Sequence, residues 1–246
     1  MYIHIHFCHV LFRIEEYNII ITDKETEIIT MKNVYALIDT ETAEMNKVYD
    51  FGYILFDKKG NILFERNYIN IDVFYNDSLM NSAYYGWKKP LYENISNLVY
   101  TTTKGMMFDF FKNCEKFGVT HLLAYNLAFD IKALKHTTKK YTHNEINFDN
   151  FVLVDIMRTA IELLINTDKY RNFCKENNEL TEKGNYKTSA ESVYRYINCD
   201  YGFNEDHTAL SDCYCEYCIF MKCLKQKKTI STGIKGNLWK MIQDCK

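Results

Sequence analysis

The chain has 246 residues and a mass of 29.3 kDa, and 47% of its residues are hydrophobic. That is enough for a domain with a full core and excludes a largely disordered protein. Lys and Arg number 30 against 32 Asp and Glu, so the formal net charge is −2 and no overall positive field attracts a polyanion. This argues only weakly against a nucleic-acid partner, because a local groove or bound metal ions can hold one.

The nine cysteines are irregularly spaced, and no signal peptide precedes them. This pattern predicts reduced thiols in an intracellular, cytoplasmic protein rather than a secreted disulfide framework. The single proline and the many Asn, Lys, Ile and Tyr residues are typical of an AT-rich genome, which suits a virus or a small parasite.

Residues 1–31 are expected to be a leader or appendage. Their apolar stretch, residues 3–14, is interrupted by histidines and an arginine, so it is too short and too polar to span a bilayer, and we expect no membrane partner. His4 and His6 have the spacing of metal ligands on a strand, but further ligands are missing, and a hairpin or disordered leader is the simpler interpretation. The functional domain is expected to begin at residue 32.

Three strands are predicted next, over residues 34–38, 48–56 and 61–69, which are rich in β-branched and aromatic residues. The Asp-Lys-Lys-Gly turn between the last two predicts an antiparallel hairpin. An aromatic-rich insert follows at about residues 72–100. Its aromatic side chains beside lysines could stack bases and hold phosphates, or could simply pack in a core, and the pattern leaves both alternatives open.

The second half of the chain alternates strands and helices. Strands are predicted over residues 121–125 and 151–154. Helices are predicted over residues 103–117, 155–165, 189–197 and 208–224, and a further helix is predicted to begin at residue 127. This order predicts an α/β fold with a mixed sheet, an antiparallel hairpin and then parallel strands, flanked by helices. Residues 225–246 form a basic tail, for which a solvated or lightly docked end is the default interpretation and a docking segment or nucleic-acid contact the alternative.

Carboxylates gather at three places along this pattern. Asp39 and Glu41 are separated by one residue after the first apolar strand, so both project from the same face of the pleat. Two carboxylates this close repel each other unless a cation lies between them, and Mg²⁺ prefers such oxygen ligands. Asp130 and Asp212 each fall on the first turns of a predicted helix, where α/β folds collect functional groups.

Such a cluster can hold two divalent cations about 4 Å apart, one activating water and one stabilising the leaving oxygen of a phosphodiester. His207 precedes Asp212 by five residues, on the loop before the last helix. From there it could accept a proton from the attacking water, with a pKa near neutrality. Together these groups point to metal-assisted phosphodiester hydrolysis.

The order and spacing of the motifs over residues 32–224 resemble the DEDDh family of 3′-to-5′ exonucleases, which have an RNase H-like (DnaQ-like) fold. The resemblance implies that two Mg²⁺ or Mn²⁺ ions are bound by Asp39, Glu41, Asp130 and Asp212, with His207 as general base. It also implies contacts to the terminal nucleotide from Thr40, Thr42 and Asn126. The implied reaction releases nucleoside 5′-monophosphates from a free 3′ end, expected to be single-stranded.

Two positions depart from the family pattern. Many members continue the first motif with Thr-Gly, where this chain has Ala43-Glu44, and many carry His where this chain has Tyr125. The first departure concerns the contact to the substrate terminus, and neither removes a metal ligand or the base. Asp155 is interpreted as a helix cap, and Phe129 as a core residue.

Alternatives remain for the function. The same fold could serve as a nucleic-acid-binding or polymerase-docking module, and a proofreading role would require a polymerase or other replication partner. The motifs do not distinguish DNA from RNA, because the metals act on a phosphate that both share. A zinc site is disfavoured at Cys213, Cys215 and Cys218, since their spacing on a helix points them to different faces.

Overall fold

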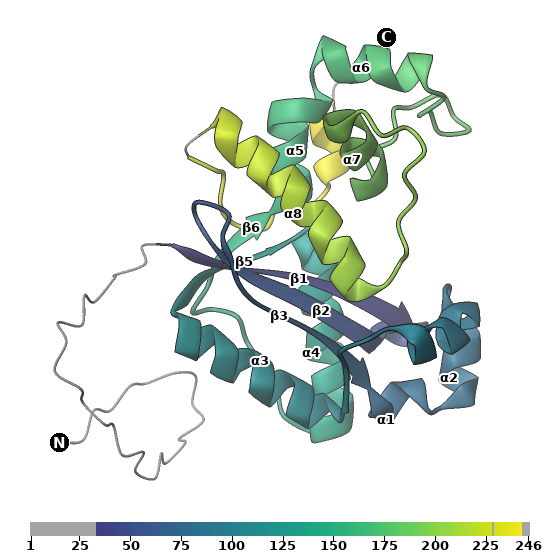
Figure 1. Cartoon of the computed structure of the whole chain (residues 1–246), viewed down its shortest axis with the longest axis vertical. Coiled ribbons are helices and arrows are strands. Elements are labelled where there is room, and N and C mark those ends of the chain that lie inside the picture. Colours follow the sequence, from purple (N-terminus) through teal and green to yellow (C-terminus); the bar gives the residue numbers. More distant parts are fainter. Residues whose placement is uncertain (1–32, 228, 243–246) are drawn as a thin grey trace, which may run out of the picture.

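The computed structural model describes residues 33–227 and 229–242 (Figure 1). The expected leader, residues 1–31 with His4 and His6, lies outside the described residues. Within the described part of the chain, no helix is both long enough and apolar enough to span a bilayer.

A six-stranded mixed sheet forms the centre of the fold, in the order β4-β3-β2-β1-β5-β6. Its strands are β1 (Val34–Ala43), β2 (Lys47–Asp57), β3 (Ile62–Asn70), β4 (Leu98–Thr101), β5 (Val119–Ala124) and β6 (Val152–Asp155). The first three strands pair antiparallel, β5 pairs parallel with β1, and β6 pairs parallel with β5. The α/β architecture with a hairpin followed by parallel strands is therefore confirmed, and β4 adds a parallel edge strand beside β3.

Helices cover both faces of this sheet. They are α1 (Ile71–Phe74), α2 (Asp77–Ser82), α3 (Thr103–Phe117), α4 (Leu127–Thr142), α5 (Ile156–Ala160), α6 (Asp168–Glu176), α7 (Ala190–Asn198) and α8 (Ala209–Gln226), with the 3₁₀-helices η1 (Glu44–Asn46), η2 (Gly86–Asn94) and η4 (Leu238–Met241) and the π-helix η3 (Ile161–Ile165). In Figure 1, α3 and α4 lie on one face, and α5, α7 and α8 lie on the other.

Strand β1 is buried on both faces, which explains its continuous apolar run. Tyr35 and Leu37 belong to the core beneath α5 and α8, whereas Ala36 and Ile38 belong to the core beneath α3 and α4. The strand does not end at Ile38 as predicted, because its pairing with β2 continues through Asp39–Gly52 and Glu41–Asp50. The two acids therefore lie within a strand, where its pleat controls their direction.

The insert at residues 72–100 folds into α1, α2, η2 and the start of β4. A small core of its own, which includes Phe74, Met80 and Tyr92, packs it against β2 and β3. Tyr84 and Trp87, in contrast, are 83% and 72% exposed. Core packing thus accounts for some of its aromatic residues but not for these two.

The described part of the tail returns to the sheet after α8. The Gly233 N–H donates to the Leu153 carbonyl at 2.7 Å, and Gly233 forms a parallel bridge with Val154 of β6. Leu238 is buried in the core on the α8 side. This segment therefore covers the β6 edge of the sheet.

Candidate active site

The pleat of β1 directs the first two acids toward α8. Asp39 and Glu41 lie two and four residues after Leu37, whose side chain lies on the α8 face, so all three side chains project from the same face of the strand. Pairing of β1 with β5 ends at Leu37–Leu123, and α4 begins three residues after β5 ends. The edge of β1 beyond Leu37 therefore meets the first turn of α4, which carries Asp130.

The start of α8 is held on β2 by a close backbone approach. Gly52 has no side chain, and a Cβ there would lie 2.4 Å from the Leu210 nitrogen and 2.5 Å from the Ala209 carbonyl carbon. Asp50, two residues before Gly52 on β2, accepts the Ala209 N–H at 3.0 Å and the Tyr92 hydroxyl at 2.8 Å. Together these contacts place Asp212, on the first turn of α8, opposite Asp39 and Glu41.

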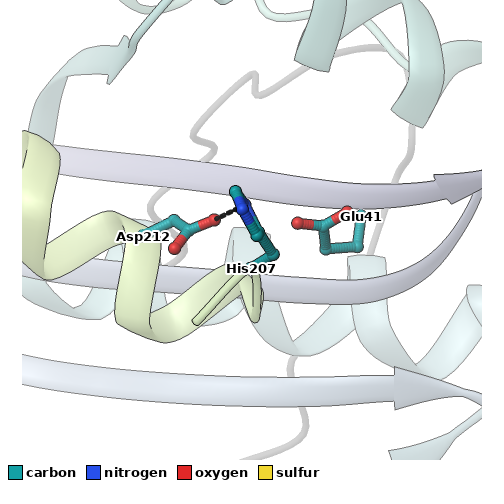
Figure 2. Close-up of side chains that lie close together, drawn as sticks. All are labelled: Glu41, His207 and Asp212. Carbon is teal, nitrogen blue, oxygen red and sulfur yellow. Dashed lines mark ion pairs between the residues drawn. The ribbon is translucent and has the colours of Figure 1, made fainter. Parts of the chain in front are cut away.

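Three predicted residues converge on one point (Figure 2). One ligand atom from each of Glu41, His207 and Asp212 lies within 4.8 Å of the others, and this is the one such metal-ligating group among residues 33–227 and 229–242. The second Asp212 oxygen, Oδ1, is buried without a hydrogen-bond partner. Converging carboxylates with an unpaired buried oxygen fit a hard divalent cation.

Burial and mutual repulsion raise the pKa values of these acids. Burial raises the pKa of Glu41 to about 9, with the Asp212 charge adding to it, and raises the pKa of Asp212 to about 8. The pKa of Asp39 lies well above its ordinary value, first because of burial and then because Glu216 and the other site acids repel its charge. Burial raises the pKa of Asp130 to about 7. A bound cation would offset this repulsion and favour the ionised forms.

Glu216 is a further carboxylate at the site, outside the three motifs of the sequence. It is buried on α8, one turn after Asp212, and its Oε2 accepts the Tyr125 N–H at 2.9 Å. Burial, and then the charge of Asp130, raises its pKa well above the ordinary value. Residues four apart share one helix face, so its spacing from Asp212 was a signal that could have found it.

Residues around Asp130 hold its carboxylate and the preceding turn. The Thr40 hydroxyl donates to Asp130 Oδ1 at 2.8 Å, so this side chain points to α4 rather than to α8. Asn126 adopts a left-handed conformation with φ 68°, and its N–H donates to Asp155 Oδ1 at 3.2 Å. The same carboxylate oxygen accepts the Arg158 N–H, which confirms Asp155 as the cap of α5 and shows that it also holds the Asn126 turn.

Phe129 of α4 and two cysteines of α8 differ in exposure. Phe129 is 38% exposed on α4, so the core assignment was wrong. Cys213 and Cys215 are buried, with their thiols turned to the Leu37 carbonyl and to Glu205 respectively. Within the described ranges, these cysteines do not join a metal-ligating group.

The histidine of the site lies between two acids. His207 Nδ1 is 3.8 Å from Asp212 Oδ2 and 3.9 Å from Glu205 Oε2. Burial, and then the positive charge of Lys88, lowers the pKa of His207. The neutral imidazole is therefore favoured at pH 7, as a proton acceptor requires.

Comparison with known proteins gives matches in structure only. No family model and no curated protein matches the sequence. The nuclease domain of 3′hExo, a DEDDh family member solved with bound rAMP, aligns with a TM-score of 0.54 and 13% identity over 84% of this chain and 98% of that chain. A 3′-exonuclease solved with a histone mRNA stem-loop aligns with a TM-score of 0.50 and 12% identity over 81% of this chain and 66% of that chain. The chain has the RNase H-like fold of DEDDh exonucleases.

This fold accounts for how the three motifs meet. Strand β1 supplies Asp39 and Glu41 from the centre of the sheet, the first turn of α4 supplies Asp130, and the start of α8 supplies Asp212. At 12–13% identity the likeness extends to the fold alone, and the chemistry of the site depends on its side chains.

Proposed function

We propose that the protein is a metal-dependent 3′-to-5′ exonuclease that hydrolyses phosphodiester bonds of DNA or RNA and releases nucleoside 5′-monophosphates. The observation that carries this proposal is the convergence of Glu41, His207 and Asp212, beside half-buried Asp39 and buried Asp130, in a DEDDh fold. We assign residues 32–224 to the catalytic domain. Mutual repulsion among these buried and half-buried acids would otherwise be a cost without a purpose.

Asp39, Glu41, Asp130 and Asp212 would hold two divalent cations, Mg²⁺ or Mn²⁺, with Glu216 next to them. When bound, such a pair activates water and stabilises the leaving oxygen of a phosphodiester. Thr40 orients the Asp130 carboxylate through its hydroxyl, and the Tyr125 N–H orients Glu216. Preorganised carboxylates of this kind avoid reorganisation during the reaction.

His207 is the proposed general base. Its lowered pKa keeps the imidazole neutral near pH 7, so it can take the proton of the attacking water. The positive charge of the resulting imidazolium would be balanced by Asp212 and Glu205, whose oxygens lie 3.8 and 3.9 Å from Nδ1.

The proposed substrate is a nucleic acid with a free, single-stranded 3′ end. The turn at Asn126 and the backbone at Thr40 and Thr42 are the proposed contacts to its terminal nucleotide. One structural neighbour was solved with bound rAMP and another with a histone mRNA stem-loop, so RNA belongs among the substrates to test. A polymerase partner and a cytoplasmic location stay predictions.

Purified protein should be incubated with 5′-labelled single-stranded DNA and RNA of one sequence, with Mg²⁺, Mn²⁺ or EDTA. Asp212→Ala is the test variant, and Asp149→Ala, at an exposed position, is its matched control. We expect a ladder that shortens from the 3′ end, requires metal, survives Asp149→Ala and disappears in Asp212→Ala. Full cleavage by folded Asp212→Ala would refute the site, and binding without cleavage by the wild type would favour the binding-module alternative.

A further inference from the structure

The segment that carries His207 has a strained backbone. His207 adopts φ 50°, in the left-handed region that residues other than glycine occupy uncommonly, although asparagine, aspartate and histidine do so more often than the rest. The next residue, Thr208, has an extended backbone and is the N-cap of α8. A conformation of this kind persists only where surrounding contacts hold it.

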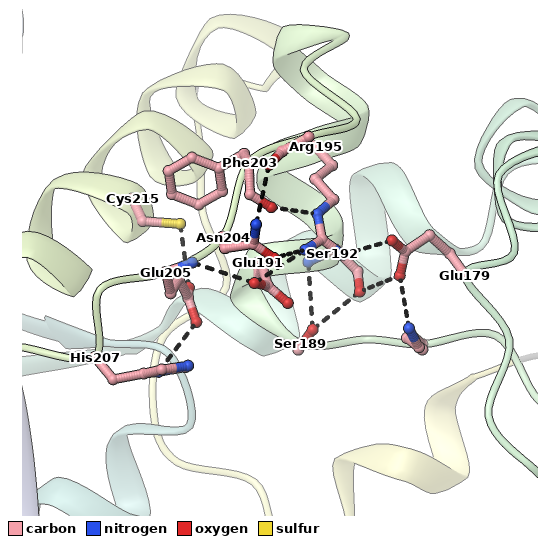
Figure 3. A network of polar contacts seen from close by, with 12 residues as sticks. Glu179, Ser189, Glu191, Ser192, Arg195, Phe203, Asn204, Glu205, His207 and Cys215 are labelled. Carbon is pink, nitrogen blue, oxygen red and sulfur yellow. Dashed lines mark hydrogen bonds and ion pairs between the residues drawn. The ribbon is translucent and has the colours of Figure 1, made fainter. Parts of the chain in front are cut away.

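Helix α7 holds one part of this segment (Figure 3). The Arg195 guanidinium donates to the Phe203 carbonyl at 2.6 Å and to Asn204 Oδ1 at 3.0 Å. The Glu205 N–H donates to Glu191 Oε1 at 3.1 Å. These bonds hold residues 203–205, and the Glu205 carboxylate in turn lies 3.9 Å from His207 Nδ1.

The insert holds the next two residues. The Tyr85 ring stacks on the His207 ring, with centroids 4.1 Å apart and an angle of 12° between the planes. The Lys88 ammonium donates to the Asp206 carbonyl, and Lys88 is only 8% exposed. Gly86, between them, passes so close to Met80 that a Cβ would lie 1.9 Å from its carbonyl oxygen.

Lys88 also places a cation in an otherwise acidic site. Its charge acts on Glu41, Asp212 and His207, and its Nζ lies 5.0 Å from the centre of the Tyr85 ring. Burying a lysine is costly unless it is paired, so its position near these acids points to a role at the site. Tyr85 and Lys88 thus approach the histidine from an insert that lies outside all three acidic motifs.

We propose that Tyr85 and Lys88 are positioning residues that hold the His207 imidazole against Glu41 and Asp212. The inference rests on the proposed exonuclease function for its catalytic consequence. A parallel ring contact resists rotation of the imidazole, and the Lys88 hydrogen bond stabilises the backbone immediately before it. Misplacing a general base by as little as 1 Å can cost on the order of 100-fold in rate.

The test compares Tyr85→Phe, which keeps the ring, with Tyr85→Leu, which removes it. Tyr75→Leu, at an exposed tyrosine of the same insert, is the control. Two quantities are measured in folded protein: the NMR shifts of the His207 ring, assigned with His207→Gln, and the kcat and KM for a single-stranded oligonucleotide. We expect Tyr85→Leu to move the His207 resonances and to lower kcat about tenfold or more with KM nearly unchanged. Tyr85→Phe keeps the ring, so it should leave the His207 resonances and kcat close to their wild-type values.

Lys88→Met cannot donate to the Asp206 carbonyl and should also lower kcat. Lys88→Arg keeps a donor and should lower kcat less. Wild-type kcat and unmoved His207 resonances in Tyr85→Leu would overturn the inference while the exonuclease assignment stands. A wild-type protein that cleaves nothing would overturn the exonuclease proposal, whereas moved His207 resonances in Tyr85→Leu would still support the positioning contact. The NMR measurement therefore separates the two failures.

Discussion

Gly52 of β2 lies directly against Ala209, the first residue of α8, with no room between them for a side chain. Gly52 is also the strand partner of Asp39. The close approach therefore determines how near α8, and with it Asp212, comes to the first motif. The site therefore requires a glycine at position 52 of β2, because any side chain there would push α8 away.

Gly52→Ala should push the start of α8 away from the sheet. The added Cβ would lie 2.4 Å from backbone that cannot rotate aside. Overpacking of this kind costs about 1–3 kcal/mol of the free energy of unfolding, and displacement of Asp212 should lower the nuclease rate by roughly 100-fold. Urea denaturation and the cleavage assay measure the two effects.

Gly236→Ala is the matched control, because nothing lies within 4 Å of a Cβ at that glycine. It should leave both stability and rate close to wild type. Equal behaviour of the two variants would show that the Gly52 contact does not position α8.

Asp50 should contribute to stability rather than to chemistry. Asp50→Ala would leave the buried Ala209 N–H and the Tyr92 hydroxyl without their acceptor. We expect a loss of about 2–4 kcal/mol in the free energy of unfolding. Asp50→Asn keeps an acceptor oxygen and should lose clearly less, and the comparison of the two by urea denaturation tests the hydrogen bonds directly. Equal losses in the two variants would argue against this role.

Glu216→Gln should weaken metal binding without disturbing the fold. The amide oxygen of glutamine can still accept the Tyr125 N–H, whereas the charge beside Asp39 and Asp130 is lost. The Mg²⁺ concentration for half-maximal activity should rise about 10- to 100-fold. Glu115→Gln, on the exposed surface of α3, should not change it. An unchanged metal requirement in Glu216→Gln would exclude Glu216 from the metal site.

Stability of the metal-free protein should depend on pH through the site acids. Their pKa values are raised in the folded state, so folding favours the protonated acids, and the stability they contribute is present below about pH 4. It is lost as the pH rises toward the folded pKa values of about 7 for Asp130, about 8 for Asp212 and about 9 for Glu41. Cations bind the ionised acids, so stabilisation by Mg²⁺ should increase over the same interval.

The measurement is the unfolding temperature from pH 5 to 9, in EDTA and in Mg²⁺, for the wild type and Asp212→Ala. The difference between the two conditions should grow with pH by several degrees, at about 2–4 °C per kcal/mol. In Asp212→Ala this growth should be much smaller. A difference that is constant with pH would contradict a metal site made of these carboxylates.

Local patterns in the sequence were sufficient to predict most of the architecture. Period-two and helical periodicities located the strands and helices around the site, and the pleat alone placed Asp39 and Glu41 on one face. They were also sufficient to nominate Asp39, Glu41, Asp130, Asp212 and His207, but not Glu216. These properties depend on residues near one another in the chain, so they can be inferred without knowing how distant segments pack.

Other features depend on contacts between distant segments. The Tyr85–His207 stack, the Gly52–Ala209 approach and the capping of α8 by Asp50 join residues more than 100 positions apart. No local periodicity records which side chain will meet another across such a separation. The exposure of Phe129 likewise depends on which face of α4 packs on the sheet. The sequence by itself therefore determined which residues carry the chemistry. The packing of α8 and of the insert on β2 decided their geometry, because close contact of side chains is a property of the assembled core.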